Sequence, residues 1–336
     1  MRKIYEQSFI ILALSLLKGI GAIFIKQSLT TVNNSYSYWS GNTTEQSLTQ
    51  LLALLSKKYS KSEIQDAIAK SEGILSECEL QNIGFTSILY KNYPQKLLTL
   101  KDPPPIIFYK GNFSLLEENI VTILGTRKPN KTGKIIAERI GKHFSSQKWV
   151  ICNGLANGID TDSIRYQDKY SFAKVVGVVG SGLAQSALRS IPKQSVENIE
   201  FILENDGLVI SEIPPLKRQD TFSSVKSCRI QAGLGGGLIL VQSSLKGGSW
   251  FTVKAAVELN IPLGVIYPVK TDIHSDDYGA NRKIIEEGIK GLHEFVELNN
   301  IKYPPSSKVI ILYSKESYPE FELALRKQEK IFAYSY

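Results

Sequence analysis

The stretch "VTILGTRKPNKTGK", residues 121–134, places an apolar run before a glycine-containing turn and a helix-like run after that turn. Similar apolar runs rich in Val and Ile recur later, separated by helix-length polar segments: "KWVICNG", "AKVVGVVGSG", "DGLVISEI", "GGLILVQ" and "IPLGVIYP". Nearly continuous apolar strands that are each followed by a helix are typical of a parallel sheet buried on both faces. The sequence therefore predicts a doubly wound, mainly parallel α/β fold of the Rossmann-like kind over about 112–270.

The turn inside this stretch almost matches a nucleotide-binding P-loop. From Gly125 it reads G-T-R-K-P-N-K-T, where the P-loop pattern is G-x-x-x-x-G-K-[ST], so Asn130 stands where the second glycine belongs. Pro129 has no backbone N–H to offer to a phosphate, and no later predicted strand ends in an aspartate that could hold magnesium. We therefore expect phosphate recognition at residues 125–127, and we interpret the match at Lys131 as a coincidence of spacing.

Other predicted strands and helices begin or end in turns of complementary chemistry. These are "NGLANGID" (153–160), "GSGL" (180–183), "SVKSCRIQAG" (224–233) and "KGGSWFT" (246–252). Ligands of doubly wound sheets bind beyond the carboxyl ends of the strands, and helix N-termini there attract anions. The candidate phosphate-contacting residues are Gly125, Thr126, Arg127, Asn130, Lys131, Gly154, Asn157, Gly158, Gly182, Lys226, Arg229, Gly248 and Ser249. These residues include no acid–base pair, so we expect binding without catalysis; Glu212 is the one carboxylate considered for chemistry, and a structural role is favoured for it.

Composition limits the other classes of function. The chain has 336 residues, of which 43% are hydrophobic, and a formal net charge of +8, which weakly favours a polyanionic partner. Seven of its basic residues lie between Thr126 and Lys148, with Glu138 as the one acid among them. Three widely spaced cysteines and three histidines argue against a zinc site, so no metal or cofactor is expected, and a reducing cytoplasmic location fits best.

The two ends of the chain read differently from its centre. Residues 1–75 show helical spacing, with a capping box predicted at Ser62 and Gln65. The apolar run from Phe9 to Leu17 is too short to span a membrane, so a buried helix is favoured over a signal peptide, and no membrane partner is expected. The segment "YPQKLLTLKDPPPIIFYKGN" (93–112) is interpreted as an extended connector and not a helix. Near the C-terminus, "SSKVIILYS" predicts a strand and "YPEFELALRKQEK" a helix.

The order of these motifs resembles that of the DNA-processing protein A family (DprA, also called Smf). The family pattern of "GTR", "SGlArGID", "GsGl", "GlliSEyp", "RNRiIagL" and "SGS–xTa–A" stands here as "GTR", "NGLANGID", "GSGL", "GLVISEIPP", "KSCRIQAGL" and "GGSWFTVKAA". The resemblance runs from about residue 10 to about 270. It implies a helical (SAM-like) domain at 1–80, an extended Rossmann-like domain at 81–290 and a strand/helix extension of unassigned role at 291–336.

The resemblance also implies a function. Members of this family bind single-stranded DNA, usually as dimers, and help to load a RecA-type recombinase onto incoming DNA during natural transformation. It therefore implies a non-catalytic, homodimeric DNA-binding protein, in which Arg127 corresponds to the arginine of "GTR" and Arg229 to the last arginine of "RNR". Aromatic residues expected to stack on bases, where they escape burial, are Tyr90, Tyr93, Phe222, Trp250 and Phe251.

Several family positions are changed in this chain. Asn157 replaces an arginine, Ser227 and Cys228 replace the first two residues of "RNR", and Ile164 replaces a histidine. Fewer cations should weaken phosphate binding and its salt dependence. The alternative hypothesis is therefore a nucleotide-binding or nucleotide-processing protein of the wider Rossmann-like group, for example in a phage-defence locus.

Overall fold

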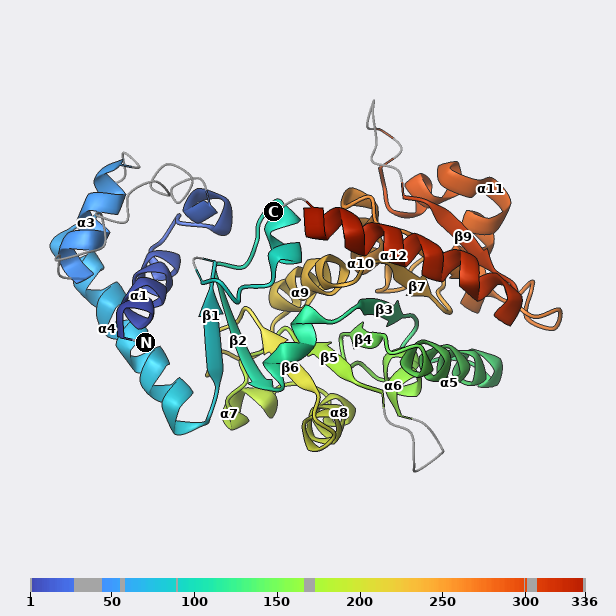
Figure 1. Ribbon diagram of the computed structural model, residues 1–336, viewed down its shortest axis with the longest axis horizontal. Coiled ribbons are helices and arrows are strands. Elements are labelled where there is room, and N and C mark those ends of the chain that lie inside the picture. Colours follow the sequence, from blue (N-terminus) through green and yellow to red (C-terminus); the bar gives the residue numbers. More distant parts are fainter. Residues whose placement is uncertain are drawn as a thin grey trace.

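A single sheet organises the chain. The computed structural model describes residues 2–26, 44–54, 58–88, 90–165, 173–298, 300 and 307–334. Within them a nine-stranded sheet has the order β1-β2-β6-β5-β4-β3-β7-β8-β9 (Figure 1). The strands from β3 onward are parallel to their neighbours in that group: β3 (Ile120–Leu124), β4 (Val150–Asn153), β5 (Val175–Val178), β6 (Leu208–Ser211), β7 (Leu238–Leu240), β8 (Leu263–Ile266) and β9 (Val309–Leu312). The mainly parallel α/β fold predicted from the sequence is confirmed.

Different helices cover the two faces of the sheet. Alternate residues of β3 point to opposite faces, because side chains alternate along a strand. Val121 and Ile123 share a core with α5 (Lys131–Ser146), α6 (Ile159–Ile164), α8 (Lys193–Glu204) and α12 (Tyr318–Tyr334). Ile120 and Leu124 pack in the two cores that contain α9 (Thr221–Leu234), α10 (Trp250–Glu258) and α11 (Gly279–Phe295). The strands are thus buried on both sides, which explains their continuous apolar runs.

Helix α5 follows from a simple periodic pattern. Ile136, Ile140 and Phe144 recur every four residues and are buried, so they line one face of the helix. Gly141 lies on the same face, where an added Cβ would come within 2.0 Å of the carbonyl oxygen of Ser163. This glycine therefore allows the later turns of α5 and α6 to approach closely.

The interpretation of residues 93–112 as an extended connector was wrong in part. The segment contains a 3-10 turn, η2 (Gln95–Thr99), and an edge strand, β2 (Ile106–Gly111), which pairs antiparallel with β6 and with β1 (Gly84–Ser87). The proline run at 103–105 ends just before β2. Prolines have no backbone N–H, but outside the strand this does not disrupt the hydrogen bonds between strands. The partner strand β6 lies about a hundred residues later, so local spacing could not reveal the pairing.

Three N-terminal helices, α1 (Arg2–Leu16), α3 (Thr44–Leu54) and α4 (Lys61–Leu80), gather at one end of the molecule beside β1 (Figure 1). The capping box predicted at Ser62 and Gln65 was wrong by two residues. Helix α4 is capped by Ser60, whose hydroxyl accepts the N–H of Glu63 at 3.3 Å, while the Glu63 carboxylate accepts the Ser60 N–H at 2.8 Å. An acid favours the first turn of a helix more than an amide does, because it also complements the helix dipole.

The C-terminal helix α12 closes one face of the sheet. Phe321 and Leu325 are fully buried and lie over glycines of the strands, since an added Cβ at Gly237 would stand 2.4 Å from Leu325. The Lys96 ammonium pairs with the Glu329 carboxylate at 2.7 Å, with only 14% of each side chain exposed. Burial raises the pKa of Glu329 overall, and the charge and hydrogen bond of Lys96 oppose that rise.

Replacing Lys96 with Met should destabilise the protein by about 3 kcal/mol, because the Glu329 carboxylate then stays buried without its cation. The double variant Lys96→Met/Glu329→Gln should recover most of that loss, since the amide carries no charge. Urea unfolding followed by circular dichroism measures both. Lys308→Met is the control, because it removes an exposed pair with Glu320 and should cost less than about 1 kcal/mol. Equal costs for the two lysines would contradict the prediction.

Candidate nucleic-acid interface

The first candidate turn lies where the winding of the sheet reverses. From β3 the chain winds through β4, β5 and β6 on one side, and later through β7, β8 and β9 on the other. In doubly wound sheets the crevice at this switch point is where ligands bind. Gly125, Thr126 and Arg127 follow β3 directly, and the Thr126 N–H donates to the carbonyl of Gln242, beyond the end of β7, at 2.7 Å. The predicted turn therefore occupies the switch point.

The N-terminus of α5 opens from the same turn. Asn130 is its N-cap: the Asn130 Oδ1 accepts the N–H of Gly133 at 2.7 Å, and its Nδ2 donates to Asp272 at 3.0 Å. The buried Gln242 side chain accepts the Asn130 N–H at 3.2 Å, while its Nε2 has no hydrogen-bond partner among the described residues. Asn130 thus positions the helix, and both of its side-chain polar atoms are engaged within the protein.

Four cations around this helix start have no carboxylate within ion-pair distance in the part of the chain that the structure describes. Arg127, Lys128, Lys131 and Lys134 are exposed, and none of them forms an ion pair with a described residue. Further along α5, Lys142 is paired with Glu138 at 2.7 Å. The positive ends of the backbone N–H groups at the helix start add to the field of these side chains. The result is a compact cationic surface, which we call the α5 cationic surface, defined by these four residues.

A second turn packs directly on the first. Gly158 has φ of +81°, and an added Cβ would stand 2.5 Å from the carbonyl oxygen of Thr126. The next residue, Ile159, donates its N–H to that same oxygen at 3.1 Å. Asn157 is exposed, and its Oδ1 accepts the N–H of Gly158 at 2.9 Å, so this turn carries an amide where the resemblance implied an arginine. The structure therefore brings residues 125–127 and 157–158 together.

The buried carboxylate of Asp160 fixes the shape of the second turn. Its Oδ2 accepts the N–H groups of Gly154 and Ala156 at 3.1 and 3.2 Å. Burial raises the pKa of Asp160 to about 7, although the two backbone hydrogen bonds and the nearby charge of Arg127 oppose the rise. The N-cap position of α6 is Gly158, so Asp160 lies inside the first turn of that helix and its carboxylate reaches back to the preceding loop. The Gly154 N–H is consequently occupied by the protein's own carboxylate.

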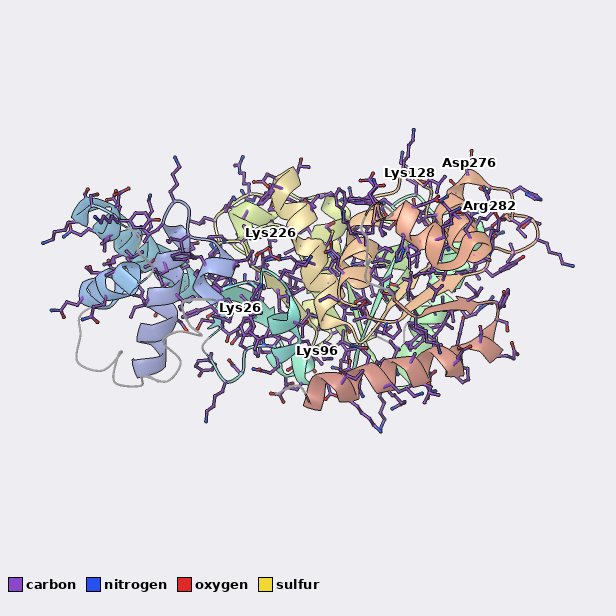
Figure 2. The ribbon with its side chains drawn as sticks, turned by 90° about the horizontal axis from the view of Figure 1, so that it is seen from above. Lys26, Lys96, Lys128, Lys226, Asp276 and Arg282 are labelled. Atoms are coloured by element: carbon purple, nitrogen blue, oxygen red, sulfur yellow. The ribbon has the colours of Figure 1, made fainter. Side chains whose placement is uncertain are left out.

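Lys226 and Arg229 belong to a separate, internally neutralised cluster. The Arg229 guanidinium makes two hydrogen bonds to the Glu212 carboxylate, at 2.7 and 2.8 Å, and its Nε lies 2.9 Å from Asp102. Lys226 contacts the same Glu212 at 3.0 Å. Burial lowers the pKa of Arg229, but its bonds to Glu212 more than offset this and raise it overall. Lys226 also lies well away from Lys128 along the molecule (Figure 2).

The remaining candidate positions serve mainly to shape the backbone. Gly182 packs on the loop before α9, where an added Cβ would stand 2.1 Å from the Pro215 oxygen. The hydroxyls of Ser249 and Ser243 lie 2.5 Å apart and are buried. Gly248 is exposed, and a Cβ added to it would meet no atom of the described residues within 4 Å. Gly182 and Ser249 are thus packed within the protein, whereas Gly248 is exposed.

The changed family positions on α9 do not supply cations either. Ser227 is buried and its hydroxyl donates to the carbonyl of Ser224 at 2.8 Å. Burial raises the pKa of the Cys228 thiol, which makes it a weak nucleophile and a poor anion partner. The part of the chain that the structure describes also contains no group of three His, Cys, Asp or Glu side chains suited to a metal ion. No helix in those residues is long and apolar enough to cross a membrane.

The fold and this site define a doubly wound α/β protein with a cationic turn at its switch point. The family model for DNA recombination-mediator protein A matches residues 84–301, so the chain belongs to that family. It is 29% identical over 233 residues to the DNA processing protein DprA of Bacillus subtilis (strain 168), covering 69% of this chain and 75% of that protein. It is 33% identical over 180 residues to the DprA of Streptococcus pneumoniae (strain ATCC BAA-255 / R6), covering 54% and 61%.

Solved structures of the family share the fold. DNA processing protein A from Streptococcus pneumoniae aligns with a TM-score of 0.66 and 23% identity, covering 93% of this chain and 97% of that one. The protein from Helicobacter pylori, whose structure concerns its single-stranded DNA binding mode, aligns with a TM-score of 0.52 and 24% identity, covering 63% and 94%. The resemblance stated from the sequence motifs is therefore confirmed.

Gly158→Ala should destabilise the protein by about 2 kcal/mol or more, because alanine is strained at positive φ and its Cβ would press on the Thr126 carbonyl. Gly73→Ala, in the exposed interior of α4 with open space around it, is the matched control and should stabilise by about 0.5–1 kcal/mol. Urea unfolding of the two variants measures the difference. A neutral Gly158→Ala would show that the two turns are not in close contact.

Asp160 should make stability depend on pH. The folded-state pKa of about 7 lies above the usual aspartate value, so between pH 4 and 7 the native state binds more protons than the unfolded state. Stability therefore falls as pH rises through this window. Relative to Asp160→Asn, which cannot titrate, the wild type should lose on the order of 3 kcal/mol between pH 4 and 8. Urea unfolding at a series of pH values tests this, and a constant difference between the two proteins would refute it.

Proposed function

We propose that this chain binds the phosphate backbone of single-stranded DNA at the α5 cationic surface. The observation that carries the proposal is the absence of ion-pair partners, among the described residues, for Arg127, Lys128, Lys131 and Lys134 at the switch point of the sheet. Cations that neutralise phosphates release counterions from the nucleic acid, which favours binding. Unpaired cations can do so without first breaking an ion pair within the protein. The membership of the chain in the family and the DNA-binding relative from Helicobacter pylori support the same ligand.

The ion pairs among the described residues favour some of the sequence-predicted phosphate contacts over others. Arg127 extends outward from the turn that packs against Gly158. Its planar guanidinium can make bidentate contacts with a phosphate. Lys131 and Lys134 follow on the first turns of α5. Lys226 and Arg229, in contrast, would have to leave Glu212 before they could contact a phosphate. We therefore propose Arg127 as the principal phosphate contact, with the lysines of α5 as secondary contacts.

We propose Phe222 and Phe251 as the side chains that stack on bases, while Tyr90 and Trp250 are half-buried. Phe222, in the first turn of α9, is 73% exposed, and Phe251, in the first turn of α10, is 38% exposed. Tyr93 is excluded from such a role, because it is 2% exposed and its hydroxyl donates to the Pro104 carbonyl at 2.7 Å. Helices α9 and α10 pack together and both start beyond the carboxyl ends of parallel strands, so the two phenylalanines flank one edge of the sheet.

We further propose binding without turnover, a homodimeric state, a RecA-type recombinase as protein partner and a cytoplasmic location. Family membership supports the partners, and the three free cysteines suit a reducing compartment. The division of the chain into a helical part at 1–80, a Rossmann-like part at 81–290 and an extension at 291–336 is proposed on the same basis. Light scattering of the purified chain and pull-down of a purified recombinase test the two protein partners.

Arg127→Ala should weaken binding of a fluorescein-labelled oligothymidylate about tenfold or more at low salt, because a hydrogen bond to a charged group contributes about 1.5–3 kcal/mol. Each cation removed from the α5 cationic surface should also reduce the slope of log affinity against log salt by about 0.7. Fluorescence anisotropy across a potassium chloride series measures both quantities, and Lys131→Ala should show the smaller loss of affinity.

The control for this experiment is Lys142→Ala, which removes a cation of the same helix that is paired with Glu138. It should change affinity less than about twofold, since an exposed paired charge contributes little. Binding by Arg127→Ala that equals the wild type would overturn the proposal. An equal loss of affinity in Lys142→Ala and Lys131→Ala would show that binding depends on overall charge and not on the α5 cationic surface.

A further inference from the structure

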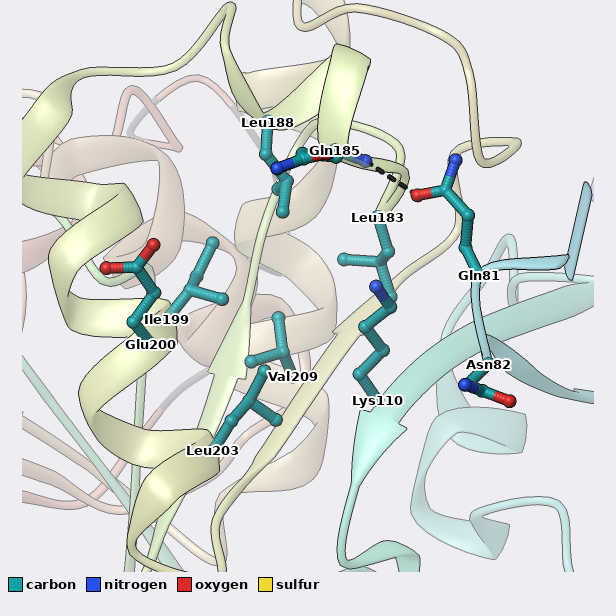
Figure 3. Close-up of a pocket in the computed structure, with 10 residues that line it drawn as sticks. All are labelled: Gln81, Asn82, Lys110, Leu183, Gln185, Leu188, Ile199, Glu200, Leu203 and Val209. Atoms are coloured by element: carbon teal, nitrogen blue, oxygen red, sulfur yellow. Dashed lines mark hydrogen bonds between the residues drawn. The ribbon is translucent and has the colours of Figure 1, made fainter.

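A second site lies beside β2, near the antiparallel edge of the sheet and away from the switch point between β3 and β7. A cavity of about 420 Å³ opens between the end of α4, the short helix α7 (Gln185–Leu188), α8 and the strands β2 and β6 (Figure 3). Lys110 on β2 is paired in register with Val209 on β6, and Leu183, in the turn after β5, lies on the other side of the cavity. This volume lies within the range of about 300–1,000 Å³ that is typical of small-molecule sites.

The walls of this cavity are mainly apolar. Ile199 and Leu203 come from α8, Val209 from β6, and Leu183 and Leu188 from the segment around α7. On the far side, the carbonyl oxygen of the Gln81 side chain accepts the N–H of Gln185 at 2.8 Å, which joins the end of α4 to α7. This hydrogen bond is drawn above the lysine in Figure 3. The cavity is therefore bounded by both the N-terminal helices and the sheet.

Among the described residues that line this cavity, Lys110 is the one cation. Its stem rises from β2 and its ammonium points toward Leu183, below the bond between Gln81 and Gln185 (Figure 3). The side chain is half-buried, and it forms no ion pair or hydrogen bond with any residue that the structure describes. Burial lowers the pKa of Lys110, and no acid within the described ranges opposes that effect. Glu200, on the rim, is exposed and does not pair with it.

We propose that this cavity binds a small organic anion, a carboxylate or sulfonate carried on an apolar ring or short chain. A partly buried ammonium without a counter-ion is unfavourable, and a bound anion would neutralise it. The apolar walls add to the binding free energy only when the ligand buries apolar surface of its own. This favours an amphiphilic anion over an inorganic one. The cavity is set apart from the α5 cationic surface, so this site does not depend on DNA binding.

The probe for this site is 1-anilinonaphthalene-8-sulfonate, an aromatic sulfonate whose fluorescence rises in apolar surroundings. The wild type should bind the sulfonate saturably. Lys110→Met should raise the dissociation constant of the sulfonate about tenfold, because the variant loses one charge-assisted hydrogen bond. The neutral analogue N-phenyl-1-naphthylamine should bind both proteins equally, because methionine keeps the apolar volume. Octanoate, but not octanol, should displace the sulfonate from the wild type.

Lys330→Met, which removes an exposed lysine of α12, is the matched control and should bind the sulfonate like the wild type. Lys110→Arg should retain binding, which separates loss of charge from a folding defect; circular dichroism verifies the fold of each variant. The proposal is overturned if the wild type shows no saturable binding, if Lys110→Met binds the sulfonate unchanged, or if Lys110→Met loses the neutral analogue equally.

Discussion

The contact of Gly158 with the backbone of Thr126 is the constraint on which the rest of the site depends. Because no Cβ stands between them, the Thr126 carbonyl can accept the N–H of Ile159, and two turns from neighbouring strands become one rigid unit. That unit leaves Arg127 pointing outward and the start of α5 open. The buried carboxylate of Asp160 holds the second turn from behind, so the surface in front can be cationic without collapsing onto an acid.

Two groups of cations in this protein have opposite roles. Lys226 and Arg229 form ion pairs within the protein. Through Glu212 and Asp102 they hold α9 against the end of β6 and the proline segment. Those at the start of α5 are left without partners among the described residues. A net charge of +8 does not distinguish these cases, since a paired lysine and an unpaired one count equally in a sequence. What separates them is the position of two acids, Asp102 and Glu212, which face the first group; the Glu212 side chain is only 4% exposed.

The elements predicted correctly are those that the spacing of apolar residues and glycines along the chain indicates. Apolar runs and strand-end glycines predicted β3 to β9 correctly, and the turn at residues 125–127 lies where the motif implied. The strand β2 was missed because its partner β6 is remote in sequence, and the capping box was placed two residues late because both alternatives fit the pattern. The pairing of Arg229 and the loop-bracing role of Asp160 were likewise hidden, since each depends on partners that only folding brings together.

The pair between Lys96 and Glu329 has a consequence for how the chain is made. Its two members are separated by 233 residues, so a ribosome must release almost the whole described chain before the contact can form. Until α12 is synthesised, Gly237, just before β7, and Gly264, in β8, belong to an open apolar face that Phe321 and Leu325 later cover. A nascent chain of this protein therefore exposes an apolar sheet surface during the last part of its synthesis, which is the kind of surface that makes a folding chain prone to aggregation.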